Sequence, residues 1–378
     1  MKKRWDIFCK VVDNFGDIGV TWRLARQLQA EHDIQIRLFV DDLQVASRII
    51  PNLAASKISQ TIDKIQIVRW DAGTDFSDYP DAVIEAFGCE LPTEYLANMP
   101  AETVWVNLEY LSAESWVEGF HGRHSDFGAA RHRRYFFYPG FTEKTGGLLH
   151  EKSLSDQSLL NHRPVIRIPL ALQGIVSPND TREALKISLF CYPHAHVAEL
   201  LQQLSQASQK CVVYVSASIL FPVVQAFLGL EKIDIGANYT KGSLTVAILP
   251  FLSQDDYDVL LRMCDLNFVR GEDSWIRAIW AGKPFVWQPY RQEEDAHLNK
   301  LNAFLELFYA DSCQKQVLRK AHEYWAAGQG DASVLGEYLR YLPDIQSDTA
   351  RQSSKLASHV DLASNLVIFI ENLQGTRV

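Results

Sequence analysis

The chain has 378 residues, of which 47% are hydrophobic and 22% are charged, an ordinary balance for a globular protein in water. Its formal net charge of −9 argues against a nucleic-acid partner, because phosphate binding draws on a basic surface. No apolar run approaches the length of a membrane span, so a membrane partner is not expected either. The length is sufficient for two domains.

The N-terminus gives no sign of export. Residues 1–7 include basic side chains but pass directly into a strand pattern, without a long apolar region or a cleavage site. Six cysteines are scattered along the chain without a CxxC pair, most of them in or beside apolar runs. This pattern favours small buried side chains in a reducing compartment over disulfides or a zinc site, so we expect a cytoplasmic protein.

The first part of the chain alternates between strand and helix patterns. Residues 7–12 form a buried strand pattern, Val20, Leu24 and Leu28 mark one stripe of a helix, and residues 34–40 alternate as a second strand. Two such strands are parallel and joined by a right-handed crossover. Further strands are predicted at 65–68, 82–86, 104–108 and 135–138. The segment 119–134 has no clean period, which predicts a mobile loop.

A second α/β series follows a connector near residues 151–180. Strands are predicted at 187–192, 212–216, 244–249, 266–269 and 285–288, and helices near 195–204, 219–227, 255–263 and 274–281. At the end of the chain, Leu356, Val360, Ala363 and Val367 lie roughly on one face of a last helix.

The element pattern predicts an α/β protein with two Rossmann-like domains that face a cleft. The first domain is expected at residues 1–165, completed by a C-terminal helix at 350–378, and the second at 180–345. A ligand is expected in the cleft between them. Many nucleotide-sugar glycosyltransferases have this architecture, which some epimerases and, more loosely, dehydrogenases share.

Residues 270–274 lie where a buried strand gives way to a helix, a position where open α/β sheets bind anions. Gly271 lets the backbone approach a ligand, Arg270 can form a bidentate contact with a phosphate, and the Ser274 hydroxyl can add a donor. Glu272 or Asp273 could bond to ribose hydroxyls. The alternative is that Asp273 or Ser274 only caps the helix.

Aromatic and polar side chains follow two other predicted strands. Phe251 could stack on a nucleobase, and Gln254 could bond to its polar edge. The alternative is that Ser253, followed by two aspartates, simply starts a helix. Tyr192, at the end of another strand, could line the cleft.

The loop at residues 13–19 contains two aspartates and two glycines. A full G-x-G-x-x-G is missing because Asn14 stands at the first glycine position, which disfavours a dehydrogenase. Asp13 and Asp17 at a strand end suit a general base or a cationic substrate better than a pyrophosphate. The alternative is that Asp17 caps the following helix. No acidic or histidine cluster has clear metal-ligand spacing.

Five motifs together resemble one known family. They are IFCKVVDNFGDIGVTWRLAR at 7–26, NLEYLSAE at 107–114, GFTEKTGGL at 140–148, RGEDS at 270–274 and AGKPF at 281–285. They resemble the motifs of bacterial protein-arginine rhamnosyltransferases that modify elongation factor P. The similarity extends from Trp5 to about residue 310.

The resemblance implies an inverting transferase of the two-domain GT-B fold that needs no metal and no cofactor. It would move rhamnose from dTDP-β-L-rhamnose to a guanidine nitrogen of one arginine in elongation factor P. The nucleotide would lie in the C-terminal domain, with Phe251 stacked on thymine, Gln254 beside it and Tyr192 lining the pocket. The side chains on the diphosphate side would be Arg270, Asp273 and Ser274, with Glu272 in the same pocket.

The resemblance also implies that Asp17 is the catalytic aspartate and Asp13 its neighbour. An arginine guanidinium has a pKa above about 12, so it is a poor nucleophile until a carboxylate orients it and a base takes its proton. We expect Asp17 to be the base and Asp13 its electrostatic partner. The alternatives are a glycosyltransferase of the same fold with another acceptor and a non-catalytic nucleotide-sugar-binding partner, although a binding protein has no need of two aspartates opposite the donor.

Overall fold

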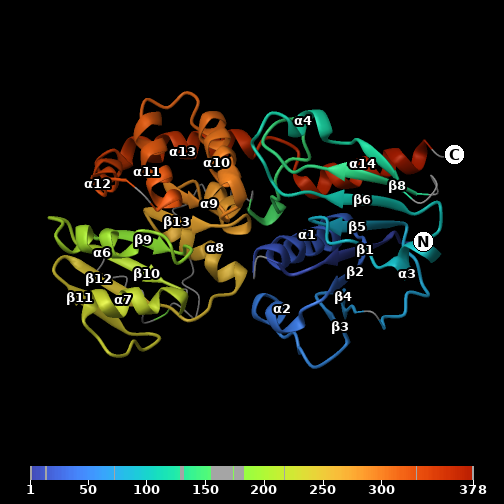
Figure 1. The fold of residues 1–378 in the computed structure, drawn as a ribbon, viewed down its shortest axis with the longest axis horizontal. Coiled ribbons are helices and arrows are strands. Elements are labelled where there is room, and N and C mark those ends of the chain that lie inside the picture. The colour runs from blue at the N-terminus through green and yellow to red at the C-terminus, as the bar shows by residue number, and fades with distance from the viewer. Residues whose placement is uncertain are drawn as a thin grey trace. The chain divides into compact units, whose positions relative to one another are not determined.

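Two sheets organise the computed structural model of the chain, one in each of two units (Figure 1). The first unit contains residues 1–156 and 356–378, and the second contains residues 157–355. The structure describes residues 2–12, 15–71, 73–127, 132–154, 173, 183–216, 218–328 and 330–376.

The sheet of the first unit is mostly parallel, with the strand order β3-β4-β2-β1-β5-β6-β8-β7. Only its edges are antiparallel, where β3 pairs with β4 and β7 pairs with β8. The strands are β1 (Arg4–Cys9), β2 (Gln35–Val40), β3 (Ser59–Ile62), β4 (Ile65–Arg69), β5 (Ala82–Ala86), β6 (Val104–Leu108), β7 (His124–Phe127) and β8 (His132–Phe137). The central order 3-2-1-4-5, read from β4 to β6, is that of a doubly wound sheet.

Helices cover both faces of this sheet because successive strand side chains point to opposite faces. Trp5, Ile7 and Cys9 pack in one buried cluster with residues of α1 and α14, whereas Phe8 packs in a second cluster with Tyr95 of α3. The helical segments of the unit are α1 (Gly16–His32), α2 (Leu43–Ile49), α3 (Thr93–Asn98), α4 (Val117–Phe120), the 3₁₀ turn η1 (Lys152–Leu154) and α14 (Leu362–Gly375).

Two expectations for the first unit need correction. The segment 119–134, predicted to be a mobile loop, contains β7 and the start of β8, which pair antiparallel. Residues 128–131 lie outside the described residues. The first strand ends at Cys9, so residues 10–12 belong to the loop that follows it. Local apolarity marked residues 10–12 as strand, but only the register with β2 and β5 fixes where pairing ends.

The predicted C-terminal helix is divided into two. Leu356 is the last residue of α13 (Leu342–Leu356), the rest of which belongs to the second unit, and Val360 is 52% exposed in the connection. The helix α14 begins after its N-cap Asp361, whose carboxylate accepts a hydrogen bond from the backbone N–H of Ser364 at 3.0 Å. The prediction that these four residues share one face of a single helix was therefore wrong, because they lie on both sides of a helix boundary.

The sheet of the second unit has the order β11-β12-β10-β9-β13-β14, parallel except for the edge strand β11. The strands are β9 (Leu185–Leu189), β10 (Cys211–Val215), β11 (Asn238–Lys241), β12 (Leu244–Ile248), β13 (Leu266–Arg270) and β14 (Phe285–Gln288). Five strands were predicted with errors of at most three residues at either end, and β11 was missed.

Helices and 3₁₀ turns join the strands of the second unit and fill the stretch that follows them. They are α6 (Val197–Ser205), η3 (Ser218–Leu220), α7 (Phe221–Leu228), α8 (Gln254–Met263), α9 (Asp273–Ala281), η4 (Glu293–Asp295), α10 (Ala296–Phe308), α11 (Lys315–Ala327), α12 (Ser333–Arg340) and α13. The four helices predicted between strands are confirmed as α6 to α9. Within the described residues, no helix is long and apolar enough to span a membrane.

Candidate active site

The second sheet reverses its winding between β9 and β13. From β9 the chain continues to β10 and β12 on one side, and later returns to β13 and β14 on the other. The carboxyl ends of β9 and β13 therefore lie side by side at a topological switch point, where open α/β sheets bind ligands. Tyr192 follows β9 and Arg270 ends β13, so the fold brings these two predicted site residues together.

Arg270 is held by two aromatic rings. Its guanidinium carbon lies 4.5 Å from the centroid of the Phe190 ring and 4.6 Å from that of Tyr192. A planar cation against ring faces is attracted electrostatically and loses conformational freedom. Phe190 was missed as a site residue, although in the predicted strand at 187–192 its spacing of two from Tyr192 places both side chains on one face.

The turn after β13 is fixed by internal hydrogen bonds. Gly271 has a φ of 63°, and its N–H donates to the Gln288 carbonyl at 3.1 Å. The Ser274 hydroxyl donates to the Arg270 carbonyl and accepts from the Arg270 N–H at 3.1 Å. The N-cap of α9 is Glu272, with no side-chain capping bond, so the alternative that Asp273 or Ser274 caps this helix was wrong. Ser274 instead closes the turn that presents Arg270.

A second helix start is tied to the first. Gln254 Nε2 donates to Asp273 Oδ2 at 3.0 Å, which links the first turns of α8 and α9. The Ser253 hydroxyl accepts from the Asp256 N–H at 3.2 Å and caps α8, as the alternative for this segment proposed. Phe251, two residues before this N-cap, has a side chain that is exposed, with 47% of the residue accessible to solvent.

A histidine ring lies beside Tyr192. The rings of His194 and Tyr192 are parallel, with centroids 6.0 Å apart. Burial lowers the pKa of the His194 imidazole, and the positive charges of Arg291 and His297 lower it further. The cation that contacts the Tyr192 ring is the Arg270 guanidinium.

In the first unit, Asp17 lies in the first turn of α1 and is 2% exposed. Its Oδ2 accepts a hydrogen bond from the Val12 N–H at 2.9 Å, and its Oδ1 accepts one from the Tyr110 hydroxyl at 3.2 Å. The N-cap of α1 is Phe15, so the alternative that Asp17 caps this helix was wrong. Asp13 lies outside the described residues.

Tyr110 follows β6, next to a polar network that joins two strand ends. Asn107 accepts a hydrogen bond from the Gly88 N–H at 3.0 Å and donates to the Glu109 carboxylate. Burial raises the pKa of the Glu109 carboxyl, against the lowering effect of Arg134. The loops after β5 and β6 are thus joined beside Asp17.

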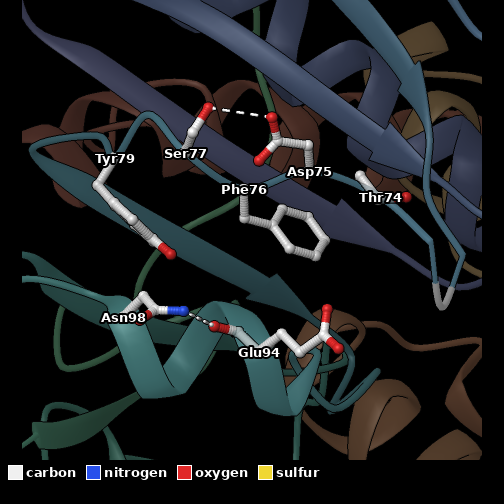
Figure 2. Close-up of a pocket in the computed structure, with 7 residues that line it drawn as sticks. All are labelled: Thr74, Asp75, Phe76, Ser77, Tyr79, Glu94 and Asn98. Carbon is white, nitrogen blue, oxygen red and sulfur yellow. Dashed lines mark hydrogen bonds between the residues drawn. The ribbon is translucent and has the colours of Figure 1, made fainter.

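A surface pocket of the first unit lies between residues 74–79 and α3 (Figure 2). It is lined by Thr74, Asp75, Phe76, Ser77, Tyr79, Glu94 and Asn98. Phe76 packs against the cluster that contains Phe8, on the sheet face opposite to α1. None of the predicted site residues lines this pocket, so it is separate from the candidate active site.

Of the seven predicted donor-site residues, Tyr192, Arg270 and Ser274 form one set of contacts, and Gln254 and Asp273 form another. Phe251 lies before the start of α8, and Glu272 is the N-cap of α9. Among the described residues, no group of three or more histidine, cysteine or acidic side chains is arranged to hold a metal ion.

Comparison with known proteins identifies similar chains over almost the whole length. A family model described as Elongation-Factor P (EF-P) rhamnosyltransferase EarP matches residues 5–371. The protein-arginine rhamnosyltransferase of Pseudomonas putida is 41% identical over 382 residues, which cover 98% of this chain and 100% of the relative. That of Shewanella oneidensis is 37% identical and covers 97% of each chain.

Solved structures agree with these relatives. A structure described as the structural basis for EarP-mediated arginine glycosylation of translation elongation factor EF-P is similar at a TM-score of 0.68 and 32% identity. This match covers 98% of this chain and 99% of that one. Acinetobacter baumannii MurG is similar at a TM-score of 0.50 and 12% identity, covering all of both chains, which is a likeness of fold alone. The GT-B fold predicted from the sequence is thus confirmed.

Proposed function

The chain belongs to the elongation factor P rhamnosyltransferase family, and from this premise we propose that it transfers rhamnose from dTDP-β-L-rhamnose to an arginine of elongation factor P. The transfer inverts the anomeric centre of the sugar. The acceptor is a translation factor, so the enzyme works in the cytoplasm. The proposed donor site rests on one structural observation: Arg270 lies at the switch point of the second sheet, where two aromatic rings contact its guanidinium.

In the proposed donor complex, the exposed Phe251 ring stacks on thymine, with Gln254 beside the base and Tyr192 lining the pocket. Arg270 binds the diphosphate on the side of Asp273 and Ser274. Backbone N–H groups at the start of α9 add positive potential where the leaving group gains charge. Glu272 stands at this helix start and lies in the same pocket.

The proposed reaction is a single displacement. A guanidine nitrogen of the acceptor arginine attacks the anomeric carbon of rhamnose, the bond between that carbon and the diphosphate oxygen breaks, and dTDP leaves. The nitrogen gives its proton to the Asp17 carboxylate as the new carbon–nitrogen bond forms. Asp13 supplies a second negative charge that holds the guanidinium. No covalent sugar intermediate is required.

The decisive experiment is intact-mass analysis of elongation factor P after incubation with the enzyme and dTDP-rhamnose. We expect an increase of one deoxyhexose, mapped to a single arginine, and no increase when that arginine is replaced by lysine. Donor binding without modification of this acceptor would instead favour a glycosyltransferase with another acceptor, or a protein that only binds the donor.

Replacing Asp17 with asparagine removes the proposed base at almost unchanged volume. We expect Asp17→Asn to lower kcat by roughly 10²- to 10⁴-fold, the usual contribution of a general base, with unchanged donor affinity. Asp33→Asn is a matched control, because Asp33 is an exposed aspartate at the other end of α1. Its backbone is in the left-handed region, which asparagine also tolerates. Loss of donor binding in Asp17→Asn, measured by calorimetry, would contradict the assignment.

Metal removal provides a further test. In the proposed mechanism, Arg270 and the N-terminus of α9 balance the negative charge of the leaving group without a metal ion. We therefore expect the transfer rate to be the same before and after treatment with a chelator. A rate that falls with the chelator and recovers with a divalent cation would exclude this account of the diphosphate site.

A further inference from the structure

Phe87 has an unusual backbone conformation for its residue type. Its φ is 58°, in the left-handed region that an aromatic residue rarely adopts, and the next residue, Gly88, has a φ of 63°. Such a conformation costs roughly 1–3 kcal/mol and persists only where the surroundings enforce it. Strain of this kind often occurs where a side chain must be held in one place for function.

Three hydrogen bonds hold the turn. The Phe87 N–H donates to the Leu108 carbonyl at 2.7 Å, and the Gly88 N–H donates to Asn107 Oδ1 at 3.0 Å. The Glu90 N–H donates to Oε1 of the buried Glu85 at 3.0 Å. The turn after β5 is therefore anchored to β6, the strand that leads into Tyr110.

The Phe87 ring lies flat against the Tyr110 ring. The two centroids are 4.5 Å apart and the rings are inclined by 14°. Tyr110 is 40% exposed, so burial in a core does not account for its orientation. The stack restricts rotation of the Tyr110 ring. The Tyr110 hydroxyl donates a hydrogen bond to Asp17 Oδ1 at 3.2 Å.

We propose that Tyr110 is a positioning residue for Asp17, and that the strained Phe87 holds Tyr110 in place. The inference rests on the proposed role of Asp17 as the base. The Val12 N–H holds one carboxylate oxygen and Tyr110 holds the other, so both carbon–oxygen bonds have a fixed direction. Fixing the base in this way aligns its lone pairs with the guanidine nitrogen before reaction, which lowers the barrier without affecting donor binding.

The test is a comparison of kcat, the KM for dTDP-rhamnose and the melting temperature in two variants. Tyr110→Phe keeps the ring and the stack but removes the hydroxyl. We expect kcat to fall roughly 10- to 100-fold, the scale of a lost hydrogen bond to a charged group, with an unchanged KM for the donor. Because the same bond also stabilises the folded chain, we expect a small fall in the melting temperature and a retained fold. A kcat equal to that of the wild type would overturn the proposal.

Phe87→Gly supplies an independent test. Glycine adopts a positive φ without strain, so the substitution removes the ring and relieves the backbone at the same position. We expect kcat to fall while the fold is retained, because Tyr110 then rotates freely. If Phe87 only shaped the turn, kcat would stay unchanged, and that result would overturn its part of the proposal.

The Asp17→Asn variant separates this inference from the proposed function. Loss of transfer in Asp17→Asn together with wild-type kcat in Tyr110→Phe would reject the positioning role and leave Asp17 as the base. Retained transfer in Asp17→Asn would reject the role of Asp17 and, with it, the inference about Tyr110.

Discussion

At the scale of single residues, Phe251 stands out because a large aromatic ring remains 47% exposed between a strand and a capped helix. In the proposed donor complex this ring covers the thymine. We expect Phe251→Ala to weaken dTDP binding by about 1–3 kcal/mol, roughly 5- to 150-fold in Kd, on the scale known for aromatic stacking on nucleic-acid bases. Calorimetric titration with dTDP measures the change directly.

Leu230→Ala is a suitable control for Phe251→Ala. Leu230 is also a partly exposed apolar residue of the second unit, but it follows α7. The Phe227 carbonyl near the end of α7 accepts a hydrogen bond from Lys241, which pairs with the first residue of β12, so this end lies at the amino end of a parallel strand. Replacing Leu230 should leave the dTDP affinity unchanged. Equal affinities for the wild type and Phe251→Ala would remove Phe251 from the base pocket.

At the scale of elements, α11 carries a buried histidine that makes the second unit sensitive to acid. His322 is fully buried and its Nδ1–H donates to the Leu318 carbonyl at 2.9 Å. Burial lowers the pKa of His322 from 6.5 to about 4, because the charged imidazolium loses its hydration. Between these two pH values the unfolded chain binds the proton and the folded chain does not, so stability decreases as the pH falls.

Because of this histidine, we expect the free energy of unfolding to decrease by about 2 kcal/mol when the pH falls from 7 to about 5. The measurement is urea unfolding at both pH values for the wild type and for His322→Leu, which cannot titrate. The wild type should lose more stability than the variant on acidification. Parallel losses in the two proteins would show that His322 keeps its ordinary pKa when folded.

The elements also show which parts of the fold can be predicted from local sequence. The strands at 82–86 and 104–108 are confirmed as β5 and β6, and the helix at Val20, Leu24 and Leu28 as α1. The two strands are continuous buried runs, and α1 is largely buried. The edge strands β3, β7 and β11 were missed because one side of each has no strand neighbour, and their residues are largely polar or exposed.

At the scale of the whole molecule, the chain returns to its first unit at the end. The buried residues of α14, Leu362, Ala363, Leu366 and Ile370, belong to the same cluster as residues of α1 and β1. Asp361, the N-cap of α14, also accepts a hydrogen bond from Gln27 of α1 at 2.9 Å. In Figure 1, the red helix α14 accordingly lies with the blue and green elements of the first unit.

Deletion of residues 357–378 should therefore destabilise the first unit selectively. The deletion removes three large buried side chains, Leu362, Leu366 and Ile370, and exposes the apolar surface that they cover. The lost burial is worth roughly 5–9 kcal/mol, comparable with the whole stability of many domains. We expect limited proteolysis to degrade the first unit while dTDP binding by the second persists and transfer is lost. A control lacking only residues 376–378, beyond the end of α14, should behave as the full chain, and full transfer by the longer deletion would contradict this account.

The sequence by itself determined the alternation of strands and helices, the GT-B fold class and, through five motifs, the family. These features depend on residues close together in the chain, where periodicity and motif spacing are directly visible. The tertiary structure alone decided that Phe190 flanks Arg270, and that Tyr110 contacts Asp17 across a sequence separation of 93 residues. The order of the strands brings these residues together, and that order arises from non-local pairing that no local pattern encodes.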